Sequence, residues 1–153
     1  MKISIITACY NAEKTIADAM ASVGRQRFET FEGCETFKKL EVEYIVVDGG
    51  STDGTVEIIK NFAEQFHCSP SPLAFTFRWL SEKDNGMYDA INKGIKMATG
   101  DVIGILNADD VLDGDYVLSR VCEGWVRGEK VRGEKFDCLY GLFVHDCGCS
   151  FAA

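Results

Sequence analysis

The sequence predicts an α/β fold in which a mostly parallel sheet is covered by helices on both faces. Strand-like and helix-like segments alternate along the chain, which is typical of sheets built from strand–helix–strand units. Two of the strand-like segments, "YIVV" (44–47) and "VIGIL" (102–106), contain no charged residue, as expected of strands that are buried on both faces. The length of 153 residues fits one domain, so we expect a single domain over residues 1–153.

Each element follows from a local pattern. Strands are expected where β-branched and aromatic residues concentrate, at 2–9, 42–48, 75–82 and 101–107. Helices are expected where apolar residues recur every three or four positions, over 12–23, 51–66 and 86–100. Ser51, Thr52 and Asp53 open the second helix as cap residues, and Gly100 is the expected glycine after the third.

The last part of the chain is predicted to add one more helix and one more strand. We expect them over residues 114–126 and 136–145. The full order is then β-α-β-α-β-α-β-α-β, with surface loops over 25–41 and 67–74.

The composition excludes several classes of protein. A net charge of −8 argues against a nucleic-acid partner, which usually requires a basic face. No apolar run approaches the ~20 residues of a membrane span, and we expect a cytoplasmic protein. Its seven scattered cysteines are then reduced thiols. His145, Cys147 and Cys149 match no common zinc spacing and are interpreted as a terminal segment.

Acidic residues follow the expected strands. In open α/β sheets, ligands bind outside the carboxyl ends of the strands. Carboxylates follow three of the first four strands, namely Asp48, Asp53, Asp84, Asp109 and Asp110. Because so many acids on one rim would repel one another, we predict a divalent cation, Mg²⁺ or Mn²⁺, with Asp109 and Asp110 as ligands.

Each of these residues also has a purely structural interpretation. The segment "DGGSTDGT" can be a tight turn before a capped helix, and Asp84 can belong to another turn. Asp110 can be a helix N-cap, and Tyr10 can pack against a neighbouring helix. A single site explains all these strand ends together, whereas the structural interpretations require several separate coincidences.

Three stretches carry a family resemblance. "SIITACYNAEKTI", "IVVDGGSTDGTVEII" and "SEKDNGMYDAINKGIKMATGDVIGILNADD" resemble, in order, the motifs of family 2 glycosyltransferases with the GT-A fold. They are similar to the bacterial branch that builds surface polysaccharides. The resemblance implies a Rossmann-like GT-A sheet, a nucleotide-diphosphate-sugar donor and a glycan or lipid-linked acceptor. It also implies inverting transfer, and association with the membrane only through the acceptor.

The resemblance assigns roles to individual residues. Tyr10, after the backbone of Ala8, would lie against the base, and Asp84 would contact the nucleotide. Asp48 would lie at the base and ribose, so replacing it should weaken donor binding and leave thermal stability nearly unchanged. The segment from Asn107 to Asp109 stands in place of the family's Asp-x-Asp metal motif.

The chain also departs from the family pattern. Asn107 replaces the first Asp of the metal motif, and Gly49 replaces the second Asp of the common Asp-Asp-Gly-Ser, which removes one base contact. Ile91 replaces a frequent Arg. The catalytic base of such enzymes lies in a downstream acceptor-binding half, so we expect a GT-A domain truncated at its C-terminus. The alternative to an enzyme is a catalytically inactive nucleotide-sugar-binding fragment.

Other α/β enzymes fit less well. A haloacid-dehalogenase-type phosphatase with Asp48 as nucleophile needs a second Asp at position 50, which is Gly50. A nicotinamide dehydrogenase needs G-x-G-x-x-G after the first strand, and "ACYNAEK" contains no glycine. A nucleotidyltransferase would have a glycine-rich loop with a basic residue at the same place.

Overall fold

The computed structural model describes residues 1–27, 41–68, 74–123 and 143–145. Its main sheet has four parallel strands in the order β3-β2-β1-β4, which confirms the predicted parallel sheet. The strands are β1 (Lys2–Cys9), β2 (Glu41–Asp48), β3 (Ala74–Ser81) and β4 (Val102–Ile105). Cys9 lies opposite Asp48, and Asp48 lies opposite Ser81, so the carboxyl ends of three strands are level.

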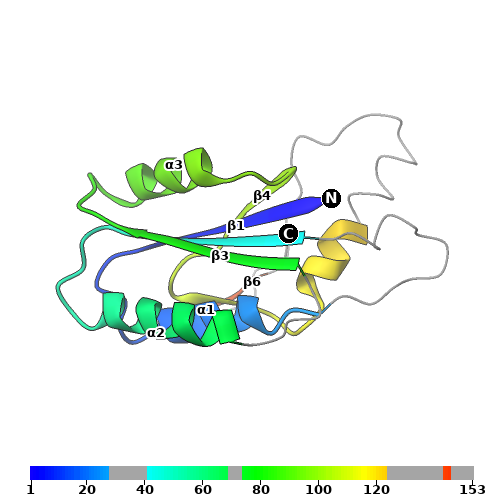
Figure 1. Ribbon diagram of the computed structural model, residues 1–153, viewed down its shortest axis with the longest axis horizontal. Coiled ribbons are helices and arrows are strands. Elements are labelled where there is room, and N and C mark those ends of the chain that lie inside the picture. Colours follow the sequence, from blue (N-terminus) through cyan, green and yellow to red (C-terminus); the bar gives the residue numbers. More distant parts are fainter. Residues whose placement is uncertain (28–40, 69–73, 124–142, 146–153) are drawn as a thin grey trace.

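Helices cover both faces of this sheet, as predicted. Figure 1 shows α3 (Met87–Met97) on one side, and α1 (Ile16–Gly24) and α2 (Thr55–Cys68) on the other. Helix α3 contacts β1 and β2, while α2 contacts β3 and α1. The chain therefore forms three layers, helix–sheet–helix.

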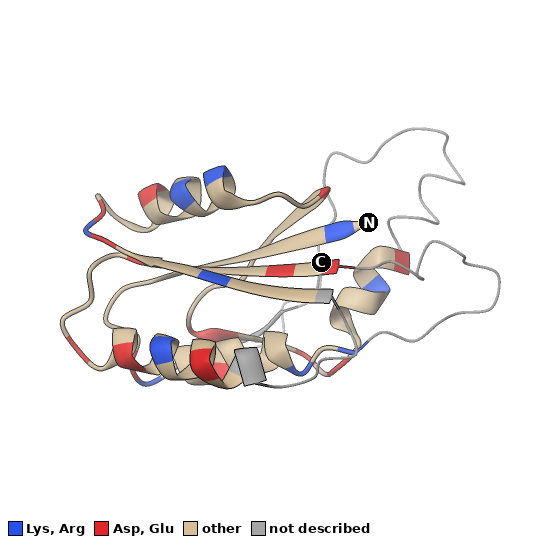
Figure 2. Cartoon of the chain, in the orientation of Figure 1, with Lys and Arg blue, Asp and Glu red and all other residues tan. Residues whose placement is uncertain are grey.

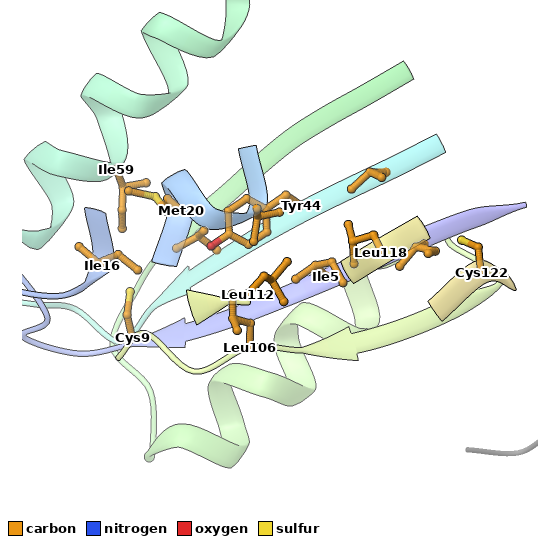
Figure 3. Close-up of a cluster of buried hydrophobic side chains, with 14 residues drawn as sticks. Ile5, Cys9, Ile16, Met20, Tyr44, Ile59, Leu106, Leu112, Leu118 and Cys122 are labelled. Carbon is orange, nitrogen blue, oxygen red and sulfur yellow. The ribbon is translucent and has the colours of Figure 1, made fainter. Parts of the chain in front are cut away.

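The hydrophobic core lies on both sides of the sheet because alternate residues of a strand point to opposite faces. On the α1 and α2 side, Tyr44 and Val46 of β2 join a large cluster that includes Met20 and Ile59 (Figure 3). On the α3 side, a smaller cluster contains Ile6, Ile45, Val47 and Ala90. Strand β2 is buried from Val42 to Asp48, which explains its uninterrupted apolar run.

The helices are shorter than their sequence patterns predicted. Helix α1 begins at Ile16 and α2 at Thr55, because the residues before them form connected turns at the strand ends. Helix α3 ends at Met97 and does not extend to Gly100. Gly100 instead passes close to β1, where a Cβ would lie 2.7 Å from the backbone nitrogen of Ser4.

The end of the chain differs from the predicted fifth parallel strand. Residues Asp110–Leu112 form a short strand, β5, which pairs antiparallel with β6 (Phe143–His145) in a separate two-stranded sheet. Three residues are too few for a recognisable alternation of apolar and polar side chains, so no local pattern predicts β5. Residues 117–123 are helical, within the helix predicted over 114–126. Residues 136–142, Cys147 and Cys149 lie outside the described residues.

A buried carboxylate connects α3 to the sheet. Figure 2 shows charged residues within the strands as well as on the helices. Glu43 on β2 is 2% exposed and accepts hydrogen bonds from Ser4 Oγ at 2.7 Å, Thr99 N at 2.8 Å and Arg78 Nη1 at 3.2 Å. Arg78 also donates to the carbonyl oxygen of Met97 at 2.7 Å. These bonds fix the end of α3 at the edge of the sheet opposite the strands' carboxyl ends.

Candidate functional site

A cleft of about 1050 Å³ opens at the carboxyl ends of the strands, where an open α/β sheet is expected to bind its ligand. Residues that follow each of the four parallel strands line it. Of the predicted donor-binding residues, four line this cleft, namely Ala8, Tyr10, Asp84 and Asp109. Asp48 and Asp110 are not among its lining residues.

Tyr10 presents an aromatic ring in this cleft. Tyr10 is 62% exposed and lines the cleft, so its ring is accessible to a ligand there. The next residue, Asn11, has a φ of +50°, in the left-handed region that asparagine tolerates better than most residues. The chain therefore turns sharply just after Tyr10 and leaves its ring at the cleft.

The loops after β1 and β2 are joined by hydrogen bonds in both directions. The backbone nitrogen of Asn11 donates to Ser51 Oγ at 2.7 Å, and Asn11 Oδ1 accepts from the nitrogen of Thr52 at 2.9 Å. The nitrogen of Glu13 donates to Asp53 Oδ2 at 3.2 Å, and Glu13 Oε2 accepts from the nitrogen of Gly54 at 3.0 Å. Asn11 and Thr52 both line the cleft, so this network shapes its floor.

Asp48 lies beneath this floor. It is 0% exposed and accepts hydrogen bonds from the nitrogens of Gly50 and Ser51, each at 3.1 Å. It also accepts from Ser51 Oγ and from Ser81 Oγ at 2.7 Å. These bonds occupy the Asp48 carboxylate, and its expected contact with the base or ribose stays a prediction. The carboxylate holds the turn that carries Gly49 and Gly50 into the cleft.

Cys9 lies beside Asp48 and is an inert thiol. Burial, followed by the charge of Asp48 and its hydrogen bond at 3.9 Å, raises the pKa of Cys9 to about 12. A thiol with so high a pKa stays protonated at neutral pH and is a poor nucleophile. Cys9 and the buried Cys122 are free, in agreement with the expected reduced thiols.

Asp84 approaches the cleft from the loop after β3. Its Oδ1 accepts a hydrogen bond from the nitrogen of Gly86 at 2.9 Å, which explains the turn before α3. Gly86 has a φ of +108°, a conformation that favours glycine. Asp84 also stands over Gly49, because a Cβ on Gly49 would lie 2.5 Å from Asp84 Oδ2.

Asp109 and Asn107 line the cleft at its other end, after β4. The side-chain nitrogen of Asn107 donates to Asp110 Oδ2 at 2.8 Å. Asn107 can thus offer its amide oxygen to a ligand. Asp110 is 8% exposed, and its position at the start of β5 excludes the alternative that it caps a helix. The Asp110 carboxylate therefore orients the Asn107 side chain, and its role as a second metal ligand stays a prediction.

These oxygen atoms fit a weakly held divalent ion better than a closed metal centre. Among the residues that the structure describes, no group of three or more His, Cys, Asp or Glu side chains could hold a metal. Asp109 and the amide oxygen of Asn107 are oxygen donors, which suit Mg²⁺ or Mn²⁺. Such ions usually complete their shells with water and phosphate oxygens, so the donor set fits an ion that arrives with a phosphorylated ligand.

Several lining residues were not predicted from the sequence. They are Cys9, Asn11, Ala12, Thr15, Gly49, Gly50, Thr52, Lys83, Gly86, Met87 and Ala90. Most of them contribute backbone or small side chains, which carry no chemical signature in a sequence. Their positions next to the predicted strand ends were the only available signal.

Within the described ranges, no helix combines the length and the apolar character that crossing a membrane would require.

Sequence comparisons with known proteins relate this chain to glycosyltransferases. Residues 4–133 match the family described as Glycosyl transferase family 2. An uncharacterized glycosyltransferase of Mycobacterium tuberculosis is 32% identical over 121 residues, which cover 79% of this chain and 38% of that protein. The poly-beta-1,6-N-acetyl-D-glucosamine synthase of Staphylococcus epidermidis is 34% identical over 113 residues, covering 74% of this chain and 23% of that protein.

A solved structure shows the same fold. The mannosyltransferase PcManGT from Pyrobaculum calidifontis, in complex with GDP-Man and Mn²⁺, aligns with a TM-score of 0.62 and 22% identity. The alignment covers 79% of this chain and 31% of the mannosyltransferase, and it confirms the predicted GT-A-type fold. The chain spans well under two thirds of the length of each of these proteins. From the family match over most of its residues, the chain belongs to glycosyltransferase family 2.

Proposed function

We propose that residues 1–153 form the donor-binding domain of a glycosyltransferase. The enzyme would transfer a sugar from a nucleotide-diphosphate-sugar to a glycan or lipid-linked acceptor, with inversion and with a divalent metal. The observation that carries the proposal is the cleft at the strands' carboxyl ends, with Tyr10 and Asp84 at one part and Asp109 at another. In cells we expect this domain in the cytoplasm, where nucleotide sugars are found.

The strand order gives the cleft a length that suits this ligand. Asp84 follows β3 and Asp109 follows β4, and these strands stand at opposite edges of the main sheet. Three spacings of about 4.8 Å place the two strand ends roughly 14 Å apart. An extended nucleoside diphosphate is of comparable length, so its diphosphate can lie near Asp109 while its base reaches towards Tyr10 and Asp84.

Individual residues of the cleft would then have different roles in binding the nucleotide and the metal ion. Tyr10 offers a ring against which the base can stack. The backbone around Ala8 and Gly50 would form the floor beneath the nucleoside, and Asp48 would support it from below. Asp109, with the amide oxygen of Asn107, would hold a Mg²⁺ or Mn²⁺ ion. The ion would supply positive charge to the leaving diphosphate.

Calorimetric titration of nucleoside diphosphates tests this proposal. We expect UDP or GDP to bind in the presence of Mn²⁺ and to bind more weakly with a chelator, since the protein alone provides few metal ligands. Mn²⁺ alone should bind poorly.

A donor-hydrolysis assay separates an enzyme from a catalytically inactive fragment that binds nucleotide sugars. Slow, metal-dependent release of sugar from the bound donor would support an active centre. Failure of any nucleoside diphosphate to bind, with or without Mn²⁺, would overturn the proposed function.

A further inference from the structure

The loop over residues 107–110, which leads from β4 into β5, is anchored on both sides. On its β4 side, the nitrogen of Leu106 donates to the carbonyl oxygen of Ile6 on β1 at 2.9 Å. On its β5 side, the nitrogen of Leu112 donates to Ser22 Oγ on α1 at 3.1 Å. The loop is therefore held between a strand and a helix that are neighbours in the chain.

The hydroxyl of Ser22 is fully used, although it is buried. Ser22 is 0% exposed, and its Oγ donates to the carbonyl oxygen of Ala19 at 2.7 Å while it accepts from Leu112. Burying a hydroxyl costs free energy unless it is hydrogen-bonded, and an alanine would suit a buried helical position better. What the hydroxyl adds is the bond to the chain after Asp109.

Gln26, just after α1, extends this connection. It is 5% exposed, and its Nε2 donates to the carbonyl oxygens of Ser22 at 3.0 Å and Gly114 at 2.7 Å. Its Oε1 accepts from the nitrogen of Leu118 at 3.1 Å, within the helix over 117–123. One buried amide therefore holds both ends of the turn between β5 and that helix against the end of α1.

The surroundings of these bonds are apolar. Leu112 and Leu118 belong to the same buried cluster as Met20 and Val23 of α1 (Figure 3). A buried polar group that loses its partner in such a cluster finds no water to replace it, so satisfied bonds there favour a single arrangement. Strand β5 has only three residues, so these bonds are a large part of what fixes its position against α1.

We infer that Ser22 and Gln26 are positioning residues for the metal ion. By fixing the chain from Leu112 to Leu118 against α1, they set where Asp109 presents its carboxylate. Neither Ser22 nor Gln26 lines the cleft, so they act through Asp109, three residues before Leu112. Metal ligands must be held within about 0.5 Å of their productive positions, and a small shift of β5 reaches the carboxylate. This inference rests on the proposed function, because it concerns the metal of the same cleft.

Calorimetric titration of UDP in Mn²⁺ and in chelator tests the inference, with GDP in its place if only GDP binds. The ratio of the two affinities measures the metal effect, and a loss of folded protein cancels from it. Ser22→Ala and Gln26→Met should each lower this ratio by about fivefold or more, the scale of one lost hydrogen bond. The affinity in chelator should change by less than about twofold, because the rest of the cleft is untouched.

A double-mutant cycle tests whether Ser22 acts through Asp109. In an Asp109→Asn background, Ser22→Ala should change the ratio by less than about twofold, because the carboxylate that it positions is gone. Ile59→Val is the matched control, since it removes buried volume from the same cluster but lies on α2. It should lower the melting temperature and keep the wild-type ratio.

The outcomes separate this inference from the proposed function. If Ser22→Ala folds and keeps the wild-type ratio, the inference is wrong and the proposed function stands; this variant decides alone if Gln26→Met does not fold. A ratio that falls as far in Ile59→Val would also overturn the inference, because the effect would then reflect stability in general. Equal binding by wild type in Mn²⁺ and in chelator would refute the inference together with the metal site. If wild type binds neither UDP nor GDP under either condition, the proposed function itself fails.

Discussion

At the scale of single residues, the acids at the strand ends serve different purposes. The sequence placed them on one rim and suggested that a cation balances their charge. In the structure, backbone N–H groups and hydroxyls satisfy Asp48 and Asp53, while Asn107 donates to Asp110. Asp84 and Asp109 are the acids among those named that line the cleft. An aspartate at the end of a strand can therefore either accept hydrogen bonds that hold a turn or face a ligand in the cleft.

Replacing Asp48 should destabilise the protein. Asp48→Ala removes the acceptor for the nitrogens of Gly50 and Ser51 and for the hydroxyl of Ser81, and leaves these partly buried donors without that partner. We expect a loss of at least about 2 kcal/mol in the free energy of unfolding, measured with urea. This prediction differs from the unchanged stability that the family resemblance implies. An unfolding curve that matches wild type, together with weaker nucleotide binding, would restore a direct role at the ligand.

Replacing Asp109 should remove the effect of metal on nucleotide binding. In Asp109→Asn, UDP should bind with similar affinity in Mn²⁺ and in chelator, because the exposed carboxylate in the cleft is lost. Calorimetry of both proteins under both conditions provides the measurement. Asp113→Asn, an exposed acid beyond β5, is the control and should keep the wild-type difference. A full metal effect in Asp109→Asn would mean that the ion is held elsewhere.

At the scale of elements, contacts between distant segments decide where the helices and strands begin and end, and the helix or strand propensity of the residues does not reveal these contacts. The three helices and four parallel strands were predicted with the correct order, since their apolar periodicity is strong. Their ends were less predictable, because hydrogen bonds between distant loops decide them. Asp53, just before α2, accepts hydrogen bonds from the nitrogen of Thr55 and from the nitrogen of Glu13 in the loop after β1. No local pattern encodes such a contact between residues about 40 positions apart.

The buried Glu43 should make the protein sensitive to acid. Burial alone would raise the pKa of Glu43, but hydrogen bonds from Ser4, Thr99 and Arg78 and the charge of Lys2 lower it from 4.5 to about 2. A folded-state pKa below the unfolded value gives stability that is complete above about pH 4.5. This stability is lost as the pH falls towards 2.

Glu43→Gln measures this contribution. At pH 7 we expect the free energy of unfolding to fall by on the order of 3 kcal/mol, as the difference in pKa implies for a buried group. The difference from wild type should shrink between pH 4.5 and pH 2. Glu57→Gln, an exposed acid on α2, is the control at each pH. A difference that stays constant with pH would assign the effect of Glu43 to packing instead of charge.

Gly94 allows α3 to lie close to the sheet. A Cβ at this position would lie 2.5 Å from Ile6 Cγ2 on β1. Gly94→Ala gains up to about 1 kcal/mol in helix propensity but overpacks the core at a cost of about 1–3 kcal/mol. We expect a lower melting temperature. Asn92→Ala, at an exposed position of the same helix, isolates the gain in propensity and should not lower it.

At the scale of the whole molecule, the sequence specified a three-layer α/β domain and the edge of the sheet that bears the cleft. The family motifs also named four of the residues that line this cleft. The sequence did not reveal that Asp48 is buried, that Asp110 turns towards Asn107, or that β5 and β6 form a separate sheet. Each of these depends on which atoms of distant segments meet, and that follows from packing rather than from local pattern.

The outer edge of the sheet should promote self-association. In the described part of the chain, β4 pairs only with β1, and its Ile103 and Ile105 are 43% and 45% exposed. Edge strands with exposed apolar side chains tend to pair with other chains. Replacing both isoleucines with threonine should reduce concentration-dependent light scattering and leave the melting temperature nearly unchanged. A fall of several degrees in that temperature would show that these side chains contribute to the folded core.

The paired hydrogen bonds between the loops after β1 and β2 also bear on the thermodynamics of recognition. Asn11, Glu13, Thr52 and Gly54 hold one another before any ligand arrives. The floor of the cleft is therefore preorganised, and the entropy of ordering it is lost during folding instead of during association. A nucleotide that meets this floor needs to order little more than its own rotatable bonds. Variants that loosen the floor, such as Asn11→Gly, should weaken binding through the entropy of association, with little change in its enthalpy.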